Sequence, residues 1–180
     1  MIRAGLRRVA TVGLGAALLV APPQSDIRVT PLVAERQVSV SFLAPSALGP
    51  ESRELVQSGL LMTLTFTVEL KQPSTAWFDR SLAAALVSSS VKYDNLTGVY
   101  HVSRMRDGHV VWSERTSDFG EAWVWLTTFD RVALSSEEAL QPNAEYYVSV
   151  RMRASPRRTF PLWPWTPDDS SGRAAFTFIR

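Results

Sequence analysis

The sequence predicts a mainly β protein, an antiparallel β-sandwich of the immunoglobulin-like kind with two short helices inserted. Three observations predict this fold class. Most of the chain beyond residue 26 alternates apolar and polar residues with a period of two, which is typical of strands with one buried face. Turn residues separate the alternating runs at short intervals. Only two segments have helical spacing. A barrel is the main competing architecture.

The clearest strand extends from Leu60 to Lys71. Its even-numbered residues from Met62 to Leu70 are apolar, and the residues between them are threonine or glutamate. We therefore expect one face of this strand to be buried. Two shorter strands are expected before it, over Ile27–Val33 and Val38–Phe42.

Two helices are expected between strands. The first covers Pro50–Ser58, with proline in its first turn, glutamates near its positively polarised end and Gly59 after its last turn. The second extends from Phe119 to about Asp130. Asp118 and Glu121 have the spacing of a capping box, although the valine, tryptophan and threonine content of this segment favours a strand.

The second half of the chain holds the remaining strands. The segment after residue 80 begins with an alanine-rich run that favours helix and continues with serine and valine that favour strand, and we expect a strand overall. Asp107-Gly108 predicts a tight hairpin, because both central positions of a type I′ turn need a positive φ. The strands expected here are Ser81–Tyr93, Val99–Met105, Val110–Glu114, Val132–Leu134, Tyr146–Arg153 and Ala174–Arg180.

The N-terminal segment has the features of an export signal. Three arginines precede an uncharged apolar run, Val9–Ala21. The run is shorter than the about 20 residues that cross a membrane, and Pro22 directly after it disfavours cleavage there. We expect residues 1–25 to be a signal peptide or an uncleaved N-terminal anchor, and residues 26–180 to form a single β-rich domain.

Export predicts a protein of the periplasm, or one anchored in the inner membrane and facing the periplasm. Membrane contact is expected only through the N-terminal segment. That segment also explains the basic character of the chain. Of 19 basic and 17 acidic residues, three arginines and no acid lie in the first 21 residues, so the rest of the chain is slightly acidic. This balance does not indicate a nucleic acid as partner.

Candidate catalytic residues are few. The chain contains no cysteine, which excludes disulfides, thiolate catalysis and cysteine-ligated zinc. His101 and His109 are the only imidazoles, and the predicted hairpin can place them near one another. Asp79 and Asp94, each beside aromatic residues, are the acids that a carboxylate-dependent hydrolase would use. Turn formation explains both acids more simply, so no catalytic residue is predicted.

No cofactor and no metal site are predicted either. The chain has no phosphate loop, dinucleotide fingerprint or nucleophile elbow. Residues 168–172 supply oxygen ligands of the kind that calcium prefers, without the carboxylate spacing of a strong calcium motif. We expect this run to be a solvated turn at the end of an irregular segment, Pro156–Gly172.

The irregular segment supplies the candidate binding site. Its prolines prevent ordinary ladder pairing and hold an extended loop. A rigid aromatic loop beside basic residues suits a sugar, a peptide or a protein surface, and it equally suits a plug that closes an open end of the sandwich. The predicted binding residues are Arg157, Arg158, Trp163 and Trp165.

A series of motifs extends through the chain: Leu55-x-x-Ser58-Gly59-Leu60, Trp77-Phe78-Asp79, the run Tyr93–Tyr100, Glu121-Ala122 and Leu140-x-Pro142-x-Ala144-x-Tyr146. Together they resemble the bacterial family catalogued as Domain of Unknown Function 4390. The resemblance implies export or membrane anchoring and a compact β-rich domain, and it supplies no activity. It also implies an envelope partner in signalling, a sensor kinase by family association.

These observations lead to one hypothesis and two alternatives. The leading hypothesis is an exported noncatalytic envelope domain that binds a protein or a glycan. The first alternative is a carboxylate-dependent hydrolase acting on envelope polymers. The second is a structural, membrane-tethered accessory protein.

Overall fold

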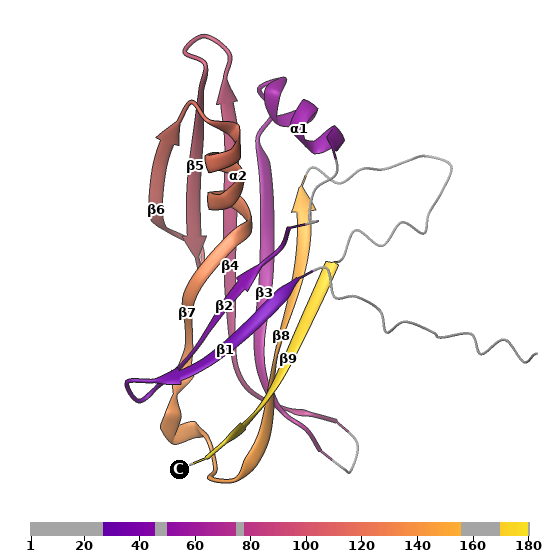
Figure 1. Cartoon of the computed structure of the whole chain (residues 1–180), viewed down its shortest axis with the longest axis vertical. Helices are drawn as coiled ribbons and strands as arrows, with labels where there is room; N and C mark the ends of the chain where they lie inside the picture. Colours follow the sequence, from indigo (N-terminus) through magenta and orange to yellow (C-terminus); the bar gives the residue numbers. More distant parts are fainter. Residues whose placement is uncertain (1–26, 46–49, 75–77, 156–169, 180) are drawn as a thin grey trace, which may run out of the picture.

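The computed structural model describes residues 27–45, 50–74, 78–155 and 170–179. Figure 1 shows their arrangement. In chain order the elements are β1 (Arg28–Ala34), β2 (Gln37–Leu43), α1 (Pro50–Gln57), β3 (Met62–Gln72), β4 (Arg80–Asp94), β5 (Val99–Arg106), β6 (His109–Thr116), α2 (Phe119–Thr127), β7 (Thr128–Ser136), the 3₁₀ helix η1 (Glu137–Ala139), β8 (Ala144–Ser155) and β9 (Ser170–Phe178).

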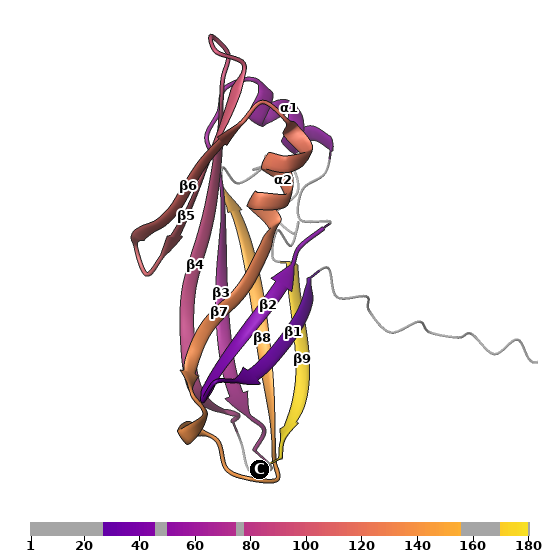
Figure 2. The ribbon, with the colours of Figure 1, turned by 60° about the vertical axis from the view of Figure 1, so that its left-hand side comes forward.

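The described strands form two antiparallel sheets. One has three strands in the order β1-β2-β7, and the other has six in the order β6-β5-β4-β3-β8-β9. Figure 2 shows the smaller sheet lying across the face of the larger one, with α2 beside it over β4 and β5. The predicted fold class, an antiparallel sandwich with two short helices, is therefore confirmed.

The core lies between the two sheets, and β3 supplies its centre. Alternate residues from Met62 to Leu70 are at most 3% exposed, as the alternation predicted. The ring of Phe66 lies 5.1 Å from that of Phe42 on β2 and 5.0 Å from that of Phe129 on β7, between centroids. Since Phe42 and Phe129 also stack at 4.8 Å, three phenylalanines join the sheets.

Local signals predicted α1, the start of α2 and the β5–β6 hairpin correctly. The main-chain N–H of Glu121 donates to the Asp118 carboxylate at 2.9 Å, which caps α2. Asp107 and Gly108 have φ values of 49° and 85°, the positive values that a tight hairpin of this type needs. The ambiguous segment after residue 80 is a strand along its whole length, because β3 pairs with it from Arg80 to Val91 and β5 pairs with it from there to Asp94.

Three of the differences from the predicted boundaries arise because a distant strand is a partner. The helix expected to reach Asp130 ends at Thr127, where the chain passes directly into β7. The short strand expected at Val132–Leu134 is part of this nine-residue strand, which pairs with β2. β9 begins at Ser170 rather than at Ala174. Gly172 therefore belongs to a strand and not to a solvated turn.

Gly172 is required by the close approach of β9 to β1, which lie side by side at one edge of the sandwich (Figures 1 and 2). A Cβ atom at position 172 would lie 2.1 Å from the main-chain oxygen of Ile27 and 2.9 Å from Cγ2 of Val29. The oxygen belongs to the backbone, so it can yield only if the strand moves.

Two arginines of β5 connect the sheets at the opposite edge of the sandwich, through hydrogen bonds to main-chain oxygens of α2 and β7. Arg104 of β5 donates to the main-chain oxygen of Trp125 from Nε at 3.1 Å and from Nη2 at 2.7 Å, and to that of Thr128 at 2.6 Å. Its guanidinium lies 5.0 Å from the ring centroids of both Trp112 and Phe129. Arg104 thus connects the large sheet to the end of α2 and the start of β7.

Two further contacts span the same edge. Arg106 donates to the main-chain oxygen of Ala133 on β7 at 2.6 Å, and the hydroxyl of Ser89, fully buried on β4, donates to that of Leu126 at 2.6 Å. Polar side chains from β4 and β5 therefore satisfy main-chain carbonyls of α2 and β7.

We expect Gly172→Ala to destabilise the protein, because the new methyl group must push β1 away from β9. Overpacking of this kind costs about 1–3 kcal/mol. Urea denaturation followed by circular dichroism measures the free energy of unfolding. Ser171→Ala, at the exposed neighbouring position, is the control and should change it by less than about 0.5 kcal/mol. Equal stability of the two variants would contradict the close approach.

We expect Arg104→Met to lower the free energy of unfolding by about 1–3 kcal/mol, because two main-chain carbonyls lose their donor while the apolar stem is retained. Thermal and urea unfolding measure the change. The matched control is Arg80→Met, which removes an exposed arginine at the start of β4. If both variants unfold alike, the contact of Arg104 with α2 and β7 does not stabilise the fold.

Candidate functional site

The four residues that the sequence singles out for binding lie outside the described residues: Arg157, Arg158, Trp163 and Trp165. The strands that bound their segment are described. β8 ends at Ser155, β9 begins at Ser170, and Met152 pairs with Ser170. The segment therefore joins the chain at the β8–β9 edge of the large sheet.

Charged and hydroxyl side chains share the outer face of the sheet beside this point. Arg153 and Arg151 of β8 pair with Thr65 and Thr67 of β3, and Glu69 follows on β3. Nη2 of Arg151 donates to the Glu69 carboxylate at 2.7 Å, and the same oxygen lies 3.1 Å from Nζ of Lys71. Burial alone would raise the pKa of Glu69, but the hydrogen bonds from Lys71 and Arg151 outweigh it and lower that pKa.

A second cluster lies further along the same face, at the loop that precedes β4. The buried Tyr147 of β8 donates its phenol proton to the carboxylate of Asp79, and the main-chain N–H of Ser74 donates to the other carboxylate oxygen at 3.2 Å. The Arg173 guanidinium of β9 lies 3.4 Å from the centroid of the Tyr147 ring. The cluster holds this loop against β8 and β9.

The hydrogen bond between the Tyr147 phenol and the Asp79 carboxylate changes the pKa of both groups. It lowers the pKa of Asp79, helped by the main-chain N–H of Ser74, and it raises the pKa of Tyr147. A hollow of about 260 Å³ lies beside the cluster, lined by Glu145, Tyr147, Arg173 and neighbouring residues. Sequence reasoning missed this cluster, although the alternation along β8 placed Tyr147 on the same face as Arg151 and Arg153.

The two acids of the hydrolase hypothesis do not converge. Asp79 precedes the first residue of β4 and Asp94 is its last residue. At about 3.3 Å per residue, the strand separates them by roughly 50 Å. The Asp94 carboxylate instead accepts from the main-chain N–H groups of Leu96 at 2.9 Å and Thr97 at 3.4 Å. Hydrogen bonds from the Thr97 side chain and the Leu96 main chain lower the pKa of Asp94.

The histidines do not meet either. His101 pairs with Arg115 and His109 pairs with Arg106, so five residues of β5, roughly 17 Å, separate their positions on the hairpin. The expectation that the hairpin can place them together is wrong. His101 lies instead with Asp94 and Arg115 beside a hollow of about 480 Å³ at the other end of β5.

The family model described as "Domain of unknown function (DUF4390)" matches residues 25–164. The chain belongs to the DUF4390 family. No curated protein and no solved structure matches the chain. The match covers every described element except β9.

In this DUF4390 domain, the residues that carried the resemblance build turns and packing. Tyr93 and Tyr100 pack at 4.5 Å on either side of the β4–β5 turn, and Tyr100 contacts Phe119 of α2 at 5.7 Å, between ring centroids. The Tyr146 phenol accepts from the main-chain N–H of Gln141 at 2.7 Å. Asp79 belongs to the Tyr147 cluster. The motifs therefore specify the fold, and Asp79 also positions the loop before β4.

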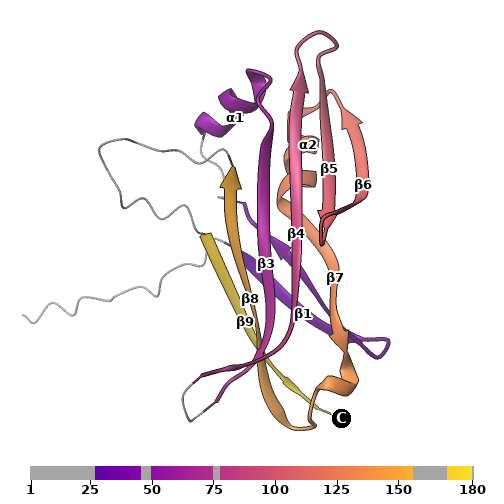
Figure 3. The same ribbon diagram turned by 180° about the vertical axis from the view of Figure 1, so that it is seen from behind.

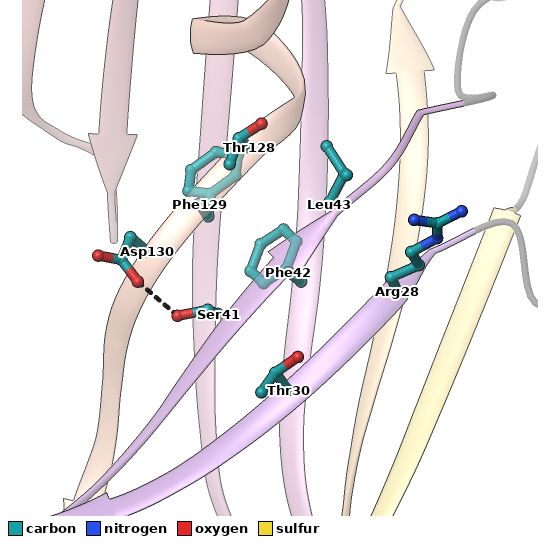
Figure 4. Close-up of a pocket in the computed structure, with 8 residues that line it drawn as sticks. All are labelled: Arg28, Thr30, Ser41, Phe42, Leu43, Thr128, Phe129 and Asp130. Carbon is teal, nitrogen blue, oxygen red and sulfur yellow. Dashed lines mark hydrogen bonds between the residues drawn. The ribbon is translucent and has the colours of Figure 1, made fainter.

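A third hollow, of about 330 Å³, lies on the small sheet of the DUF4390 domain. Figure 4 shows the rings of Phe42 and Phe129 side by side in it, with Ser41 pointing to Asp130. The Ser41 hydroxyl donates to Asp130 at 2.6 Å and accepts from the main-chain N–H of Arg131 at 3.1 Å. The register of β2 on β7 shifts at this point. The hollow thus lies at an irregularity in the pairing of β2 with β7.

Among the residues that the structure describes, no three histidine or acidic side chains gather where they could hold a metal ion. Within the same residues, no helix is long and apolar enough to cross a membrane.

We expect Tyr147→Phe to lower the melting temperature at pH 7, because Asp79 loses its phenol donor. The pKa of Asp79 is lower in the folded state than its ordinary value of 3.8. The bond therefore stabilises the fold above that pH, and the stabilisation is lost as the pH falls through the lowered pKa. Melting curves at pH 7 and pH 3 should show the difference between variant and parent narrowing.

Tyr93→Phe is the matched control for Tyr147→Phe. Its hydroxyl has no hydrogen-bond partner among the described residues, so its effect on the melting temperature should not depend on pH. A Tyr147→Phe effect that is the same at both pH values would show that Asp79 does not couple to the phenol.

Proposed function

We propose that this DUF4390 domain is an exported, noncatalytic binding module of the cell envelope. It binds a protein or a glycan through the outer face of β8 and β9 together with the adjoining segment from Arg157 to Trp165. The N-terminal signal supports export into the periplasm, either free or anchored in the inner membrane. The side-chain composition of the outer face is the observation that carries the proposal.

Guanidinium groups and hydroxyls alternate on this face in register across three strands. Arg151 lies between Thr67 of β3 and Ser171 of β9, and Arg173 of β9 pairs with Ser149 of β8. Arginine presents several donors in a fixed plane, which suits carboxylates, phosphates and sugar hydroxyls. A sheet face of this kind offers an extended surface, which fits a polymer or a protein.

The adjoining segment contains two tryptophans, a residue type that β8 and β9 do not contain. Trp163 and Trp165 are large, rigid aromatic residues of the type that dominates recognition of sugars and proteins. The segment that contains them joins the sheet between Ser155 of β8 and Ser170 of β9. An envelope protein, a sensor kinase by family association, is the partner class that the family suggests.

The alternative functions draw less support from the geometry. A paired-carboxylate hydrolase would need Asp79 and Asp94 on one substrate, whereas they lie at opposite ends of β4. A structural, membrane-tethered accessory role depends on an uncleaved N-terminal segment as the tether, and that segment lies outside the described residues.

The double substitution Trp163→Ala, Trp165→Ala should abolish capture of the partner and leave the melting temperature nearly unchanged. Crosslinking in intact cells, followed by pull-down and mass spectrometry, measures the capture. Trp125→Ala is the contrasting control. Its ring packs on Trp112 at 5.3 Å, so its loss should lower the melting temperature. A large loss of stability in the double variant would instead assign the segment to a plug.

A further inference from the structure

A row of basic side chains crosses three neighbouring strands at the α1 end of the large sheet. Lys92 of β4 pairs with His101 of β5, and His101 pairs with Arg115 of β6. The three side chains therefore lie on one face of the sheet, and all three are exposed. Two permanent cations, Lys92 and Arg115, thus lie on either side of the His101 imidazole on an exposed face, which is an arrangement that suits an anionic ligand.

Acids form ion pairs with some cations of the described chain, but not with the two permanent cations of this row. Arg151 and Lys71 both pair with Glu69, whereas no ion pair holds Lys92 or Arg115 in the described residues. The acid beside the row is Asp94, whose carboxylate accepts the main-chain N–H groups of the β4–β5 turn. The Asp94 carboxylate is therefore bound to the turn, and no ion pair joins it to Lys92 or Arg115 within the described residues.

Exposed leucines lie next to the row. Leu96, in the β4–β5 turn, is 98% exposed, and Leu60 and Leu61 are 50% and 56% exposed. Gly59 packs against Asn95 of the same turn, which brings the two leucines after it to this end of the sheet. Figure 3 shows the turn between β4 and β5 projecting beyond α1. An apolar tip with cations behind it is thus the outermost part of the described chain at this end.

We propose that this tip docks on an anionic lipid bilayer. Leu96, with Leu60 and Leu61, enters the interface, while Lys92, His101 and Arg115 contact lipid phosphates. Burial of the leucines in the acyl boundary and attraction of the cations to the charged surface act together, as in other peripheral membrane contacts. This contact is separate from the proposed binding face of β8 and β9 and from the N-terminal apolar run.

The absence of cysteine allows a local test in the full chain. Leu96→Cys carries the only thiol, which takes a polarity-sensitive fluorophore. Its emission should shift to the blue on vesicles of phosphatidylglycerol and phosphatidylcholine, and should not shift on phosphatidylcholine alone. Ile179→Cys is the matched control, because this residue is 78% exposed beyond the end of β9. Its fluorophore should remain in water on both vesicles.

The cationic row is tested in the labelled Leu96→Cys background. Removing two permanent charges, with Lys92→Gln and Arg115→Gln, should raise the lipid concentration at half-maximal shift roughly thirty-fold, since each cation near an anionic surface contributes about five-fold. Arg36→Gln with Arg80→Gln removes the same net charge from exposed positions elsewhere and should change it by less than about three-fold.

Three outcomes would overturn the proposal. One is a fluorophore at position 96 that stays in water while the protein is vesicle-bound, since binding would then use the N-terminal run alone. Another is an equal shift on neutral vesicles. The last is that both double substitutions weaken vesicle binding equally. The binding would then depend on the net charge of the protein rather than on the position of Lys92 and Arg115. Circular dichroism confirms that each variant is folded.

Discussion

The architecture depends on one constraint, which is that a sheet of three strands must cover a sheet of six. Phe66, Phe42 and Phe129 fill the centre, where the two sheets overlap. Beyond β7 the small sheet ends, and part of the inner face of β5 has no strand opposite it. There α2 covers the large sheet, and Arg104 faces inward because its guanidinium satisfies carbonyls of α2 and β7. The mismatch in width thus explains both the inserted helix and an arginine at an inward position.

The sequence allowed prediction of features that depend on neighbours along the chain. Alternation identified β3 and its buried face, Asp107-Gly108 identified the hairpin, and the Asp118 cap identified the start of α2. Features that depend on distant strands were not predictable in the same way. The length of β7 depends on β2, and the need for glycine at position 172 depends on the main chain of Ile27. Neither partner is visible in the local pattern.

The same distinction applies to the candidate sites. Composition pointed to the tryptophans and arginines between β8 and β9, and the structure fixes where that segment joins the sheet. The cluster of Asp79 with Tyr147 joins residues 68 positions apart, and the row from Lys92 to Arg115 depends on the register of three strands. Residue type suggested each member singly, but only the register shows which members meet.

The position of β9 bears on where this domain ends. The family match stops at residue 164, yet β9 pairs with β8 along nine residue pairs and lies against β1. A chain shortened to the matched residues would leave the N–H and C=O groups of β8 without partners along one side, and it would uncover the main chain at Ile27. Such an open edge recruits strands from other molecules. The folding unit is therefore larger than the family boundary, because β9 pairs with the main chain of β8 and covers that of Ile27.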